Sequence, residues 1–174
     1  MLTAEEFKQE PIMRIEWLPA EMLQANGYNP NVVLRQELEL LEFSVLKTGW
    51  IQPVLVNRDY IIIDGFHRWT LSLKSDRLRE KYMGQVPCVV LDIDKPEAML
   101  MTVRINRAKG SHSAVKMHDL IKQLVDEHAY DMQRIAQGIG GHKGEVELLY
   151  SEGVFAAKKT AEHQYSKAWK PRTA

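Results

Sequence analysis

The stretch Ile61-Ile62-Ile63-Asp64-Gly65-Phe66-His67-Arg68-Trp69 is the part of the sequence on which the fold depends most directly. Its β-branched residues predict a strand that Asp64-Gly65 ends, and residues 66–81 have the pattern of a helix. Residues 52–56 form a second β-branched run, which the turn-forming residues 57–59 separate from the first. We therefore expect a β-hairpin that leads directly into a helix.

The flanking residues extend this pattern into an α/β fold. Alternation predicts a strand over 12–18, and a strongly apolar run predicts another over 85–91. Amphipathic spacing predicts a helix over 32–47. Asp94 followed by Pro96 is typical of the start of a helix, here over 95–106. A small mixed sheet flanked by helices is the architecture expected for residues 11–110.

The rest of the sequence is predicted to be helical. Residues 114–128 have the pattern of a helix, and shorter helices over 131–140 and 144–153 are separated by Gly140-Gly141-His142. Two short helices across a glycine turn have the outline of a helix-turn-helix, with His142 and Lys143 as candidates for DNA contact. A structural helical hairpin explains the same pattern. We expect a helical domain over 111–155 and a tail over 156–174.

The turn after the hairpin carries residue types that suit phosphate. A helix N-terminus offers unpaired backbone N–H groups and the positive end of the helix dipole. Gly65 permits close approach of the backbone, and Arg68 can donate to two phosphate oxygens. Asp64 is the candidate for Mg²⁺ binding or proton transfer, and His67 for acid–base catalysis or a hydrogen bond to phosphate. The alternative is a sharp turn with His67 and Arg68 on the surface.

A second candidate segment, RINRAKGSH, occupies residues 104–112. Several of its side chains can contact phosphate, and they run into a glycine, so the end of the preceding helix can clamp an anion. A solvated basic helix end is the alternative. The candidate residues are Arg104, Asn106, Arg107, Lys109, Ser111 and His112.

Composition excludes several classes of protein. The single cysteine among 174 residues, Cys88, excludes a disulfide framework and a cysteine-rich zinc site, and its apolar neighbours predict burial. No segment approaches the roughly 20 apolar residues of a membrane span. The acidic N-terminus has no secretory features, so we expect a cytoplasmic protein with no membrane association.

Charge is distributed unevenly along the chain. The 23 Lys and Arg balance the 23 Asp and Glu, but residues 1–100 carry a net −4 and residues 101–174 a net +4. This asymmetry favours the second half of the chain as the region that binds a polyanionic partner.

Residues 12–112 resemble the ParB/sulfiredoxin-like superfamily in the order of their motifs. Residues 64–68, Asp-Gly-Phe-His-Arg, are similar to the second box of ParB-like partition proteins. They are equally similar to the Gly-Cys-His-Arg of sulfiredoxins and the Asp-Gly-His-His-Arg of free-serine kinases. Asn29-Pro30 and residues 104–107 are similar to the first and third ParB boxes. The resemblance implies a pocket for a nucleoside triphosphate, ATP or CTP, together with Mg²⁺.

Departures from these families narrow what the resemblance implies. Phe66 stands where sulfiredoxins carry their catalytic cysteine, which excludes sulfinic-acid reduction by that route. His67 replaces the first arginine of the Gly-Glu-Arg-Arg box of partition proteins, so a CTP-dependent clamp is not implied. The segment 104–113, the helical domain and the terminal YSKAWKP are also similar to short bacterial and prophage ParB-like proteins. Some of those are transcriptional co-activators encoded beside a reductase-like partner.

Two functions are compatible with these features. The first is a nucleotide-binding protein that binds DNA or regulates transcription, and the helix-turn-helix outline favours it. The second is an ATP- or ADP-dependent phosphotransferase or NTPase that acts with a partner protein, and the Asp-Gly-x-His-Arg form favours it. The sequence leaves open a reductase-like partner and assembly into a homo-oligomer.

Overall fold

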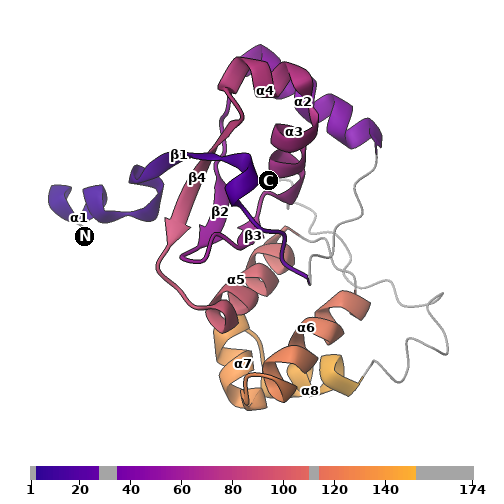
Figure 1. Cartoon of the computed structure of the whole chain (residues 1–174). Helices are drawn as coiled ribbons and strands as arrows, with labels where there is room; N and C mark the ends of the chain where they lie inside the picture. The colour runs from indigo at the N-terminus through magenta and orange to yellow at the C-terminus, as the bar shows by residue number, and fades with distance from the viewer. Residues whose placement is uncertain (1–2, 28–34, 110–113, 152–174) are drawn as a thin grey trace, which may run out of the picture.

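The structure is a computed structural model that describes residues 3–27, 35–109 and 114–151 (Figure 1). Within these residues a four-stranded sheet has the order β1-β4-β2-β3. β4 pairs antiparallel with β1 and parallel with β2, and β2 pairs antiparallel with β3. This mixed sheet among helices confirms the predicted α/β class. The strands are β1 (Ile15–Pro19), β2 (Val54–Asn57), β3 (Ile62–Asp64) and β4 (Gln85–Leu91).

The centre of the sheet is the core of the first half of the chain. Val54, Val56, Val86 and Cys88 are completely buried there. Burial, with a smaller contribution from Glu16, raises the pKa of the Cys88 thiol to about 12. Cys88 is therefore the buried small side chain that the sequence predicts.

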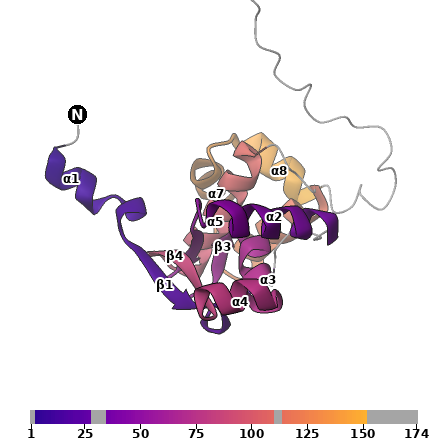
Figure 2. The ribbon, with the colours of Figure 1, turned by 90° about the horizontal axis from the view of Figure 1, so that it is seen from above.

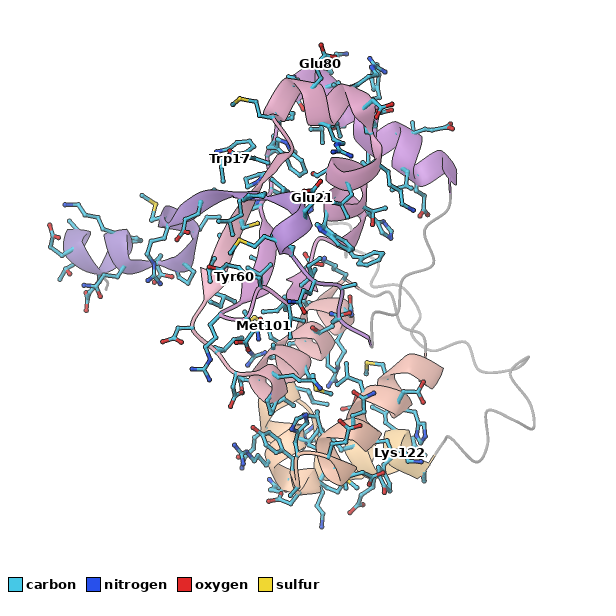
Figure 3. All side chains as sticks on the ribbon, in the orientation of Figure 1. Trp17, Glu21, Tyr60, Glu80, Met101 and Lys122 are labelled. Atoms are coloured by element: carbon cyan, nitrogen blue, oxygen red, sulfur yellow. The ribbon has the colours of Figure 1, made fainter. Side chains whose placement is uncertain are left out.

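Three helices pack against one another through Val45, Leu71 and Leu78, and the last two of these helices contact β4. They are α2 (Arg35–Thr48), α3 (Phe66–Lys74) and α4 (Asp76–Tyr82). The chain before the sheet forms α1 (Ala4–Gln9) and the 3-10 turn η1 (Pro11–Met13), which project from the body in both views (Figures 1 and 2). Trp17 lies on the outer strand β1 and stacks on Tyr82 (Figure 3). A second 3-10 turn, η2 (Ala20–Met22), follows β1.

The helix α5 (Lys95–Ala108) lies between the sheet and the last three helices (Figure 1). These are α6 (Ala114–Asp126), α7 (Met132–Ile139) and α8 (Lys143–Ser151). Met99, Leu100 and Val103 of α5 share a buried core with all three. A Cβ at Gly138 would lie 2.6 Å from Leu100 Cδ1, so the glycine lets α7 approach α5 closely. α5 therefore belongs to the packing of the helical part as well as to that of the sheet.

Local signals predict most of the elements, but several boundaries differ by two or more residues. The helix expected over 66–81 is two helices, because Ser75 has extended backbone and its side chain caps the N-terminus of α4. The strand expected over 12–18 begins at Ile15, since Pro11–Met13 form a 3-10 turn. The helix expected over 95–106 continues to Ala108. Among the described residues no helix is long and apolar enough to cross a membrane.

Candidate functional site

The turn between β3 and α3 depends on Gly65. Its φ of +95° lies in the left-handed region, which favours glycine over residues with a side chain. A Cβ at this position would lie 3.0 Å from Arg68 Nη2 and 3.2 Å from Val54 Cα. The glycine is therefore required both for the backbone conformation and for the space that the Arg68 guanidinium occupies.

Arg68 is held over this turn by two acceptors from different elements. Its Nη2 lies 3.2 Å from Asp64 Oδ2, and its Nη1 donates to Gln52 Oε1 at 2.8 Å. Only 13% of the side chain is exposed. Burial lowers the pKa of the guanidinium, and the attraction of Asp64 partly offsets this effect. Arg68 is a largely desolvated cation with a fixed direction.

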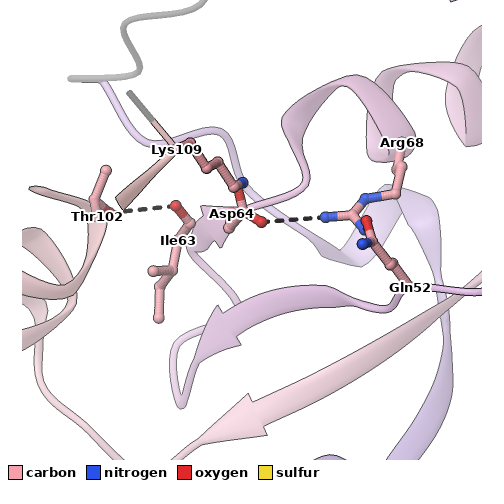
Figure 4. Close-up of polar contacts among 6 residues, drawn as sticks. All are labelled: Gln52, Ile63, Asp64, Arg68, Thr102 and Lys109. Carbon is pink, nitrogen blue, oxygen red and sulfur yellow. Dashed lines mark hydrogen bonds and ion pairs between the residues drawn. The ribbon is translucent and has the colours of Figure 1, made fainter. Parts of the chain in front are cut away.

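Lys109, the C-cap residue of α5, reaches the same carboxylate (Figure 4). Its Nζ lies 2.6 Å from Asp64 Oδ1, and half of its side chain is exposed. Thr102 lies seven residues earlier, two turns back on the same face of α5. Its hydroxyl lies 2.9 Å from Ala98 O in its own helix and 3.3 Å from Ile63 O at β3, and it shares one proton between them. α5 is thus held against the end of β3, which brings Lys109 to the turn.

We call Asp64, Arg68, Lys109 and Gln52 the Asp64 cluster. It contains two cations and one carboxylate, so it carries one positive charge in excess. Sequence patterns did not predict the roles of Gln52 and Thr102. Gln52 is one polar residue before a strand and Thr102 is one hydroxyl in an apolar helix, and neither gives a local signal. Their roles depend on contacts across 16 and 39 residues.

His67 lies in the first turn of α3, as expected. Its Nε2 is buried and has no hydrogen-bond partner among the described residues. A buried unpartnered nitrogen is costly unless a ligand or water satisfies it. His67 therefore carries, in the first turn of α3, a hydrogen-bonding group that the described residues leave unpaired.

The structure does not gather the RINRAKGSH segment into one clamp. α5 continues through residue 108, so successive basic side chains point in different directions around the helix. Arg104 pairs with Glu97 at 3.4 Å on an exposed face. Arg107 pairs with Glu145 of α8 at 3.0 Å and donates to Ile139 O at 3.4 Å. Of Arg104, Arg107 and Lys109, only Lys109 belongs to the Asp64 cluster.

The other predicted residues of this segment give less information. Asn106 is half-buried on α5, one turn after Thr102. Ser111 and His112 lie outside the described residues.

A resident Mg²⁺ does not fit the donors around Asp64. Both of its carboxylate oxygens already contact cations, and Arg68 and Lys109 would repel a divalent ion. Within residues 3–27, 35–109 and 114–151, no group of three His, Cys, Asp or Glu side chains could hold a metal. The cluster has the chemistry of an anion site instead.

The short helices α7 and α8 meet at Gly140, whose φ is +66°. His142 and Lys143 are exposed at the start of α8, and Lys143 pairs with Glu147 at 3.4 Å. Residues 114–151 contain four Lys and Arg against six Asp and Glu. The positive excess of residues 101–174 therefore comes from residues 101–113 and 152–174, not from the helices α6, α7 and α8.

Comparison with known sequences places these features in a family. The model of the ParB N-terminal domain matches residues 3–107. The chain is 31% identical over 168 residues to Uncharacterized protein YbdM of Escherichia coli, covering 94% of this chain and 79% of that protein. It is 21% identical to the Probable chromosome-partitioning protein ParB of Rickettsia bellii, covering 82% of this chain and 48% of the relative. It therefore spans about half the length of that partitioning protein.

Solved structures give a looser match. A truncated ParB of Caulobacter crescentus bound to the centromeric parS site is 24% identical, with a TM-score of 0.48 over 77% of this chain and 69% of that one. The same protein with CTP-γ-S is 23% identical, with a TM-score of 0.44 over 83% of this chain and 88% of that one. Since these scores lie below 0.5, the family assignment rests on the sequence match.

Proposed function

Because the chain belongs to the ParB N-terminal domain family, we propose that it binds the phosphates of a nucleoside triphosphate at the β3–α3 turn and that bound nucleotide controls contact with DNA. The observation that carries this proposal is the Asp64 cluster. Two cations from separate elements converge on one small acidic group, beside a helix N-terminus that begins at a left-handed glycine. Such a turn is suited to phosphate oxygens.

The proposal gives each residue of the turn a role. Arg68 and Lys109 neutralise phosphate charge, and the free N–H groups at the start of α3 donate to phosphate oxygens. His67 Nε2 supplies a further hydrogen bond, since it has no partner among the described residues. Mg²⁺ arrives with the nucleotide, because Asp64 is engaged by cations and does not form a resident metal site.

The DNA half of the proposal assigns contact to the start of α8. His142 and Lys143 are exposed there, next to the glycine turn that separates α7 from α8. The net negative charge of residues 114–151 predicts weak non-specific binding by these helices alone. Nucleotide binding at the end of α5 can change the DNA affinity of these helices, because α5 packs directly against α7.

Calorimetric titration with CTP, ATP and ADP, each with Mg²⁺, tests the phosphate site. We expect binding of at least one nucleotide, weakened about tenfold or more by Arg68→Gln, since a charge-assisted hydrogen-bond pair is lost. Arg58→Gln is the matched control, because Arg58 forms an exposed ion pair with Asp92 near the β2–β3 turn. No binding by the wild-type protein, or equal binding by Arg68→Gln, would overturn the proposal.

Fluorescence anisotropy with a labelled DNA duplex, with and without CTP or ATP and Mg²⁺, tests the second half. We expect binding that differs with and without nucleotide and that falls with salt, and Lys143→Ala should reduce the salt slope by about one. Lys122→Ala on α6 is the control with the same charge change (Figure 3). Absence of salt-dependent binding would make α7 and α8 a structural hairpin. Release or transfer of phosphate in the same samples would indicate the phosphotransferase instead.

A reductase-like protein partner and a homo-oligomer stay predictions. Co-purification and light scattering, respectively, are the measurements that check them.

A further inference from the structure

Asp64 already engages the two cations that a bound phosphate would need. Its Oδ2 contacts Arg68 and its Oδ1 contacts Lys109, so a single carboxylate satisfies both cations (Figure 4). A phosphate group also presents two neighbouring oxygens to such a pair of donors. The carboxylate and a ligand phosphate are therefore alternatives for the same two side chains.

The three groups differ in their freedom to move. The Asp64 backbone is fixed at the end of β3, where it pairs with Leu55 of β2. Arg68 is packed over Gly65 and held by Gln52. The Lys109 side chain is long and half-exposed, and it contacts Asp64 through its terminal Nζ. A ligand phosphate can therefore gain both cations if the Asp64 side chain turns away and Lys109 moves to the phosphate.

We propose that Asp64 is an internal counter-anion that a ligand phosphate displaces, and that this displacement lowers the affinity of the site for every phosphate, so that only ligands with several phosphates bind well. The inference rests on the proposed function, and it replaces the metal-binding or catalytic role that the sequence predicts for Asp64. Displacement costs the two existing ion pairs whatever the ligand is, so the affinity for every phosphate falls by a similar factor. A triphosphate still binds through its further phosphates, whereas orthophosphate has one group and binds weakly.

The variant Asp64→Asn tests this displacement directly, because it keeps the shape of the side chain and removes its charge. Calorimetry with inorganic tripolyphosphate and with orthophosphate, both without Mg²⁺, gives the affinities of wild type and variant. We expect Asp64→Asn to bind orthophosphate about tenfold or more tightly than wild type, with a gain of similar size for tripolyphosphate, because the same two ion pairs are no longer lost. Both affinities therefore rise in the variant, and their ratio stays about the same.

Asp92→Asn is the control for net charge. Asp92 pairs with Arg58 at 3.5 Å and its side chain is 92% exposed, so its loss changes total charge equally without touching the turn. We expect its affinities to stay within about twofold of wild type, as for an exposed, screened charge. Asp64→Ser is the second variant, and thermal unfolding checks that each protein is folded.

The outcomes separate this inference from the proposed function. Equal or weaker orthophosphate binding by folded Asp64→Asn and Asp64→Ser overturns the inference, because Asp64 would then position Arg68 or assist the ligand. Equal gains in Asp92→Asn also overturn it. Wild-type binding of CTP or ATP is measured separately, so the nucleotide proposal can stand when the counter-anion role fails. Conversely, tighter orthophosphate binding by Asp64→Asn supports the counter-anion role even if no nucleotide binds to the wild type.

Discussion

Arg68 and Arg107 each lie against a glycine and an acidic side chain, one at the β3–α3 turn and the other at the α7–α8 turn. A Cβ on Gly65 would lie 3.0 Å from Arg68 Nη2, and a Cβ on Gly141 would lie 2.8 Å from Arg107 Nη1. Both arginines are mostly buried, with 13% and 25% of their side chains exposed. On these local features the two sites are alike.

Their partners make them different. Arg107 has its own carboxylate, Glu145, and also donates to Ile139 O at the end of α7, so its charge is balanced within a brace between helices. Arg68 shares Asp64 with Lys109, which leaves one positive charge in excess beside a helix N-terminus. The excess positive charge suits Arg68 to binding an anion. The matched charges of Arg107 and Glu145 instead stabilise the contact between α5 and α8.

The largest expected difference in stability between the two turns comes from replacing their glycines with alanine. Gly65→Ala should lower the free energy of unfolding by about 2 kcal/mol, because it places a side chain at φ +95° and against Arg68 and Val54. It should also weaken phosphate binding about tenfold, since the guanidinium must shift. Denaturant unfolding and tripolyphosphate calorimetry measure the two effects.

Gly141→Ala is the counterpart of that substitution. It meets only the ends of the flexible Arg107 and Glu145 side chains, so the change in stability should stay within about 1 kcal/mol. Equal destabilisation by the two alanines would remove the distinction between the two turns.

Exchanging each arginine for glutamine sharpens the same comparison. Arg68→Gln should lower tripolyphosphate affinity about tenfold or more, because a desolvated cation at the site is lost. Arg107→Gln should instead cost about 1 kcal/mol of stability, because it removes the brace between α5 and α8. Calorimetry and thermal unfolding of both variants give the result. A loss of binding in Arg107→Gln as large as in Arg68→Gln would return Arg107 to the phosphate site, as the sequence predicts.

A smaller effect is expected at the contact that places Lys109. Thr102→Val keeps the shape of the side chain and removes the hydroxyl, whose one proton is shared between Ala98 O at 2.9 Å and Ile63 O at 3.3 Å. We expect a loss of stability of about 1 kcal/mol, since these carbonyls lose that donor. Hydrogen exchange should show faster exchange at β3 and α5, with α7 and α8 unaffected. Unchanged exchange at β3 would contradict the role of Thr102.

The smallest effect belongs to Arg104. Its ion pair with Glu97 is exposed on both sides, so Arg104→Gln should change stability by about 0.5 kcal/mol or less. Tripolyphosphate titration of the variant shows whether this third-box residue contacts the ligand. Weakening comparable with that of Arg68→Gln would mean that Arg104 leaves Glu97 when phosphate binds.

Short-range sequence patterns predict much of the fold. The hairpin before residue 64, the strand over 85–91 and the Asp94 cap of α5 follow from β-branched runs, turn residues and capping chemistry. The break at Ser75 is less visible, because the apolar spacing continues across it and only the serine cap divides the helix. The candidate site was only half predictable, since Asp64, Gly65, His67 and Arg68 are adjacent while Gln52 and Thr102 are distant.

The sequence by itself determined the α/β class and the glycine turn that opens α3, because each depends on residues within a few positions of one another. Tertiary structure decided which charges meet. Lys109 joins Asp64 across 45 residues, and Arg107 joins Glu145 across 38. A helix turns its successive side chains about 100° apart, so basic residues that are neighbours in sequence reach different partners. Only the packing of α5 against the sheet and against α7 and α8 made one of them part of the Asp64 cluster and another a brace between helices.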